Sequence, residues 1–133
     1  MIKKLLVLIL TIVTLSATVM VSAGEVEIRK VVMQKTGSGW VFEVTLKHDD
    51  TGWKHYANAW RVLAEGGKVI KTRVLAHPHV NEQPFTRGLG GVLIPKGSKL
   101  VIVEARDTIH GWSKKRVLIN LAKDKGEKYF IKR

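Results

Sequence analysis

Short stretches in which apolar and polar side chains alternate recur from Glu25 onward, and they constrain the fold more than any other feature of this chain. An alternation of period two places successive side chains on opposite faces of a β-strand. Between residues 24 and 133 no stretch with the 3.6-residue period is long enough to predict a helix. The sequence therefore predicts an all-β protein.

The alternation predicts seven strands. Residues 40–46 show it most clearly, because large apolar side chains occupy every second position. Turn sequences such as Glu65-Gly66-Gly67 separate the strands. Seven short strands in about 100 residues favour an antiparallel β-sandwich of the immunoglobulin or fibronectin-III type, with a small barrel as the alternative. The expected strands are residues 25–35, 40–46, 56–63, 69–75, 85–94, 100–105 and 115–121.

The first 23 residues have the pattern of a secretory signal. Lys3 and Lys4 precede an uncharged apolar run, residues 5–21, and Ala23 ends a group of small residues that a signal peptidase reads. We expect cleavage after Ala23, which makes the product periplasmic or secreted and not an integral membrane protein. An uncleaved anchor is the alternative, since the run is close to the shortest that spans a bilayer. Residues 24–122 then form the sandwich domain, and residues 123–133 form a basic C-terminal tail.

The chain is strongly basic and has no Cys. It carries 23 Lys+Arg against 11 Asp+Glu, a formal net charge of +12. Without Cys there is no disulfide, no thiolate metal site and no cysteine to carry the lipid of a lipoprotein. The positive charge suits an anionic surface, an acidic polymer or an acidic protein as partner. Nucleic acid is not expected, because no nucleic-acid-binding motif is present and the chain is predicted to be exported.

The histidines gather in the connections that the strand order predicts for one end of the sandwich. Connections between successive antiparallel strands alternate between the two ends, so residues 48–54, 77–84 and 107–114 are expected to lie together. Every histidine lies in or beside these three segments, and carboxylates accompany them. The residues concerned are His48, His55, His77, His79, His110, Glu82 and Asp107.

Imidazole is the commonest metal-binding side chain, and three or four neutral imidazoles suit Zn²⁺ or Cu²⁺. In the His77-Pro78-His79 segment, the proline favours an extended backbone that turns both imidazoles to one side. A polar packing network of the same residues, or unrelated surface histidines, are the alternatives. The expected ligands are His55, His77, His79 and His110, with His48, Glu82 and Asp107 as further ligands or as partners that orient them.

Two loop tryptophans indicate a different function for the end of the sandwich that carries the histidines. Trp53 and Trp112, together with Arg87, could dock an acidic partner or stack on a glycan. Ser98 and Ser113 belong to no nucleophile motif, so the chain is not expected to be an enzyme. The predicted function is metal buffering, sensing or delivery, and the alternative is a non-catalytic binding or assembly module.

Three segments carry a resemblance to known proteins: residues 53–60 (WKHYANAW), 77–87 (HPHVNEQPFTR) and 105–112 (ARDTIHGW). With them the chain resembles a family of small exported bacterial proteins of unassigned function, over roughly residues 40–121. The resemblance implies a periplasmic β-sandwich that has these segments as its hallmark. It implies no activity.

Overall fold

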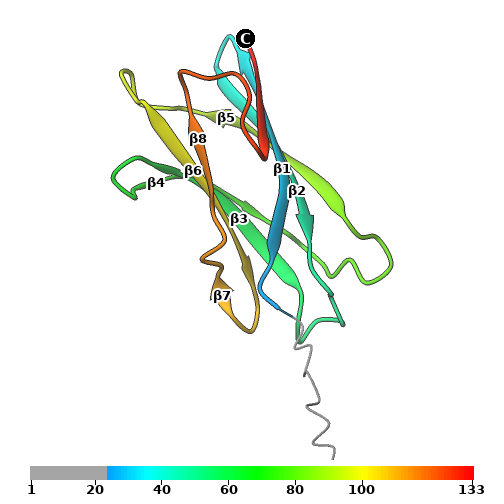
Figure 1. Ribbon diagram of the computed structural model, residues 1–133. Helices are drawn as coiled ribbons and strands as arrows, with labels where there is room; N and C mark the ends of the chain where they lie inside the picture. The colour runs from blue at the N-terminus through cyan, green and yellow to red at the C-terminus, as the bar shows by residue number, and fades with distance from the viewer. Residues whose placement is uncertain (1–23) are drawn as a thin grey trace, which may run out of the picture.

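The computed structural model describes residues 24–133, and the predicted signal, residues 1–23, lies outside them. This part of the chain folds into nine strands and contains no helix, which confirms the all-β prediction (Figure 1). The strands are β1 (Glu27–Thr36), β2 (Gly39–Lys47), β3 (Ala57–Ala64), β4 (Val69–Val74), β5 (Phe85–Val92), β6 (Leu100–Asp107), β7 (Gly111–Trp112), β8 (Val117–Asn120) and β9 (Tyr129–Lys132).

The strands form two sheets that enclose one core. One sheet has the order β5-β2-β1-β9, and the other has the order β4-β3-β6, with β7 and β8 both paired to the outer side of β6. A single apolar cluster joins side chains of both sheets, including Phe42 of β2, Trp60 of β3 and Val103 of β6, all fully buried. The architecture is therefore sandwich-like. Its immunoglobulin-like identity stays a prediction.

The strand count of seven is wrong, since the described residues form nine strands. The two additional strands are short: β7 has two residues in an expected loop, and β9 has four residues in the expected tail. Tyr129 and Ile131 of β9 are buried, and β9 runs parallel to β1, so the sandwich is not purely antiparallel. Residues 129–132 thus belong to a sheet of the sandwich.

Alternation decides which face each strand buries. In β2, Phe42, Val44 and Leu46 are fully buried, while Glu43 is exposed and Thr45 is partly exposed. In β6 the side chains from Val101 to Ala105 are all buried, as expected for a strand flanked on both sides. The turn of the β1–β2 hairpin lies at one end of the sandwich, and the β2–β3 and β6–β7 connections lie at the other (Figure 1).

Candidate functional site

The β2–β3, β4–β5 and β6–β7 connections are joined to one another by hydrogen bonds. The backbone N–H of His79, in the β4–β5 connection, donates to Asp50 Oδ2 in the β2–β3 connection at 2.8 Å. Thr108 Oγ1, in the β6–β7 connection, donates to the carbonyl oxygen of Lys54 at 3.0 Å. The three histidine-bearing connections therefore meet in space, as the strand order predicts.

Asp50 is the acceptor that ties two of these connections together. Its Oδ1 lies 2.6 Å from His48 Nδ1 and accepts the backbone N–H of Ala57 at 2.9 Å, while Oδ2 accepts the N–H of His79. Burial alone would raise the pKa of this carboxyl. The hydrogen bonds from His48, His79 and Ala57 outweigh burial and lower the pKa below its ordinary value of 3.8. Asp50 is therefore a buried carboxylate, and its side chain is 0% exposed.

His48 has one ring nitrogen bonded and the other without a partner. A carboxylate can only accept, so Asp50 fixes the proton of the neutral His48 ring on Nδ1. The lone pair then lies on Nε2, which is buried and makes no hydrogen bond to the described residues. Buried polar atoms almost always have a partner. A histidine whose Nδ1–H is held by a carboxylate and whose Nε2 is free has the form in which histidine binds a metal.

His55 and Asp107 lie next to His48. His48, His55 and Asp107 each offer one ligand atom, and these three atoms all lie within 4.8 Å of one another. His55 Nε2 is 3.1 Å from Asp107 Oδ1, and the rings of His48 and His55 meet at 4.7 Å between centroids. Ligand atoms on one tetrahedral zinc lie roughly 3.3 Å apart, given bonds of about 2.0–2.1 Å. Small side-chain shifts therefore suffice to place all three on one ion.

Asp107 is held as firmly as Asp50. Its carboxylate accepts the backbone N–H groups of Ile109 and His110 at 2.9 and 2.8 Å, and His110 Nδ1 lies 3.0 Å away. Burial would raise the pKa of Asp107, but these hydrogen bonds from His110 and Ile109 lower it below 3.8. The ring of His110 lies 5.2 Å from that of His55, so His110 borders the group from its more exposed side.

His77 and His79 form a second ring pair, 4.5 Å between centroids. His79 stacks on Phe85 at 3.9 Å, and its Nε2 accepts a hydrogen bond from Arg87 at 2.8 Å. Burial, the charge of Arg87 and the neighbouring His77 lower the pKa of His79 below 6.5. Glu82 lies 3.6 Å from Arg87 and is largely exposed. The structure thus divides the four favoured histidines into two pairs, His55 with His110 and His77 with His79.

The two loop tryptophans differ in environment. The guanidinium carbons of Arg61 and Arg106 lie 3.7 and 4.9 Å from the ring centroid of Trp112, so this ring packs within the protein. Trp53 is 68% exposed and touches Tyr56 only edge-on, at 5.7 Å. Of the two, Trp53 is the one with a ring open to a partner.

Sequence reasoning placed His48 among the secondary residues and did not select Asp50. A signal for both was present, because the alternation of β2 continues beyond its last residue. Phe42, Val44 and Leu46 face the core, and the next even positions are His48 and Asp50, both buried. Counting in steps of two through Lys47 would have pointed both side chains inward.

Comparisons with known proteins give one informative match. No known protein family and no solved structure matches the chain. Over 97 residues it is 34% identical to a protein of Halomicrobium mukohataei named "Putative lipoprotein". The match covers 72% of this chain and 47% of that protein, so the chain spans about half the length of its relative. This likeness to a protein without an assigned activity agrees, in that general sense, with the resemblance stated above.

Within residues 24–133, no helix has the length and apolar character needed to cross a membrane.

Proposed function

We propose that this chain is an exported protein of the cell envelope that binds a divalent transition metal through His48, His55 and Asp107. Cu²⁺ and Zn²⁺ are the candidate ions, and the role is buffering, sensing or delivery of the metal. The observation that carries the proposal is the clustering of one ligand atom each from His48, His55 and Asp107 within 4.8 Å, at a histidine whose Nε2 is buried and has no partner. Export is supported by the signal pattern of residues 1–23 and by the printed name of the relative.

The donor set favours these ions. Two imidazoles and one carboxylate form an N,N,O set that suits Zn²⁺ and Cu²⁺, and the chain has no thiolate to offer a softer ion. Asp50 supplies the outer carboxylate that fixes the tautomer of His48. A metal bound at His55 Nε2 would take the place of the hydrogen bond to Asp107, with the proton of the neutral ring on Nδ1.

His110 is the natural candidate for a fourth ligand. Its Nδ1 lies 3.0 Å from the Asp107 carboxylate that would bind the ion, and its side chain is one-third exposed. A rotation of this side chain brings an imidazole nitrogen to the open side of the site. His77 and His79 are not part of this site, because the group of ligand atoms is made of His48, His55 and Asp107, and the two other histidines pair with each other.

The first test measures metal binding by tag-free protein after its metal has been stripped. Titration calorimetry with Zn²⁺ or Cu²⁺ at tens of micromolar should show one site, and the melting temperature should rise. Saturation at a hundredfold excess over Kd stabilises a protein by about 2.7 kcal/mol. His48→Gln should abolish both effects, while the matched control His77→Gln should keep them.

The His55→Gln variant is a second test in case His48→Gln fails to fold, since His55 lies nearer the surface than His48. It should weaken binding at least tenfold while its circular dichroism spectrum stays that of the wild type. The proposal fails if the wild-type protein shows no metal-dependent shift, or if the His48 and His77 variants bind equally well.

A further inference from the structure

We propose that the end of the sandwich that carries the three connections rests on an anionic lipid membrane. The contact would be made by a membrane-facing patch, defined as Trp53, Lys54 and Ile109. This inference does not depend on metal binding.

The apolar part of the patch consists of two large side chains that the fold leaves in solvent. Trp53 is 68% exposed and Ile109 is 62% exposed. They come from different connections, but these connections touch where Thr108 Oγ1 donates to the Lys54 carbonyl oxygen. Tryptophan is enriched where a bilayer meets water, because its ring is apolar while its N–H can reach the headgroups.

The charged part of the patch is basic. Lys54 follows Trp53 directly and is exposed. In residues 24–133 Lys54 has no carboxylate within ion-pair distance, whereas the nearby Asp49 is paired with Lys47 at 3.5 Å. An unpaired lysine beside exposed apolar side chains matches the phosphates and acyl chains of anionic lipids.

The direction from which the chain enters favours a membrane over a soluble acidic partner. Glu27, at the start of β1, pairs with Lys47 at the end of β2, and Ser113 donates to Glu25 at 3.1 Å. The described chain therefore begins at the same end as the patch (Figure 1). The sequence immediately before it includes the uncharged apolar run of residues 5–21. Until the signal is cleaved, such a segment keeps this end of the domain close to the bilayer.

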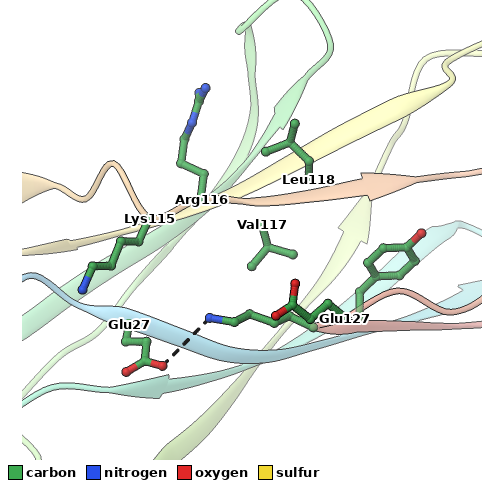
Figure 2. Close-up of a pocket in the computed structure, with 8 residues that line it drawn as sticks. Glu27, Lys115, Arg116, Val117, Leu118 and Glu127 are labelled. Atoms are coloured by element: carbon green, nitrogen blue, oxygen red, sulfur yellow. Dashed lines mark ion pairs between the residues drawn. The ribbon is translucent and has the colours of Figure 1, made fainter.

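A groove between β8 and β9 is a second hollow on the surface (Figure 2). Its wall combines Lys115 and Arg116 with Glu27 and Glu127, and Glu27 is paired with Lys128 at 3.9 Å. This mixed lining selects no charge, and nothing identifies an occupant.

The test uses the protein as recovered from the envelope of expressing cells, with a chelator present so that metal plays no part. Vesicles of phosphatidylcholine with about one-third phosphatidylglycerol should carry the protein down on sedimentation, and pure phosphatidylcholine should carry much less. Tryptophan emission should shift to the blue on binding. Both effects should weaken as salt approaches about 0.5 M.

The Trp53→Ser/Ile109→Ser variant should bind the anionic vesicles at least about tenfold more weakly and lose the emission shift. Its matched control is Leu93→Ser, because Leu93 is 69% exposed but lies beside Gly39 at the opposite end. For charge, Lys54→Gln should weaken binding more than Lys96→Gln in the β5–β6 connection.

Three results would overturn the proposal: no preference for anionic vesicles, equal loss in patch and control variants, or self-association that only the Trp53/Ile109 variant abolishes. The last would show that a second copy of the chain covers this end. Circular dichroism and the melting temperature of each variant establish that it is folded.

Discussion

Asp50 and Asp49 are adjacent residues with opposite roles. Asp50 accepts three hydrogen bonds and is buried, whereas the side chain of Asp49 is 74% exposed and pairs with Lys47. The Asp-Asp sequence by itself does not distinguish the two residues. The distinction comes from the continued alternation of β2, which turns position 50 inward.

Replacing Asp50 should therefore be costly and replacing Asp49 should not. In Asp50→Asn one acceptor oxygen becomes an NH₂ group facing donors, which leaves buried N–H groups without acceptors and costs about 3 kcal/mol. Asp49→Asn removes only an exposed ion pair, and its effect should stay within about 0.5 kcal/mol. Urea unfolding measures both, and equal effects would contradict the role assigned to Asp50.

Acid should destabilise the protein through the same carboxylates. The pKa values of Asp50 and Asp107 are lower in the folded state than the ordinary 3.8. Their contribution is complete above the unfolded-state pKa and is lost as pH falls through the folded-state values. The free energy of unfolding should thus drop below about pH 4. In Asp50→Asn this drop should be smaller, and an unchanged pH profile would exclude Asp50 as a cause.

At the scale of elements, long alternating strands were predictable and short ones were not. Residues 40–46 and 56–63 were identified because seven or eight positions repeat one pattern. Strand β9 has four residues and follows a segment of Lys and acidic residues, so an alternation over four positions could not be told from a polar tail. Its place beside β1 depends on long-range pairing that no local pattern encodes.

Side chains of β9 should respond as a strand and not as a tail. Ile131 is 2% exposed and packs in the common core, so Ile131→Ala should cost about 2–5 kcal/mol. Lys132→Ala, at the neighbouring exposed position, should change stability by about 0.5 kcal/mol at most. Thermal or urea unfolding distinguishes the two variants. If Ile131→Ala leaves stability unchanged, residues 123–133 behave as a tail and not as part of the sheet.

For the whole molecule, one core implies one unfolding unit. The apolar cluster includes β1 and β2 of one sheet and β3 and β6 of the other, so neither sheet keeps its buried face covered alone. Tryptophan fluorescence and far-ultraviolet circular dichroism should therefore report the same midpoint in urea. Two separate midpoints would show that the sheets unfold independently.

The all-β, sandwich-like architecture followed from the alternation in the longer strands, and the meeting of three connections followed from their alternating directions. The grouping of the histidines within that end did not follow from the sequence pattern. His79 stacks on Phe85 and accepts from Arg87, whereas His48 takes a place beside His55 and Asp107. These preferences arise from burial and side-chain packing after the loops have closed, so no spacing in the sequence reveals them.

The pairing of β1 with β9 joins the first strand of the described chain to the last. During synthesis the ribosome releases β1 early, but its outer neighbour β9 emerges only after strands β2 to β8. Until then the backbone N–H and C=O groups along that edge of β1 lack their partners, and the space for Tyr129 and Ile131 is unfilled. A nascent chain of this protein cannot complete the sandwich before β9 has been synthesised.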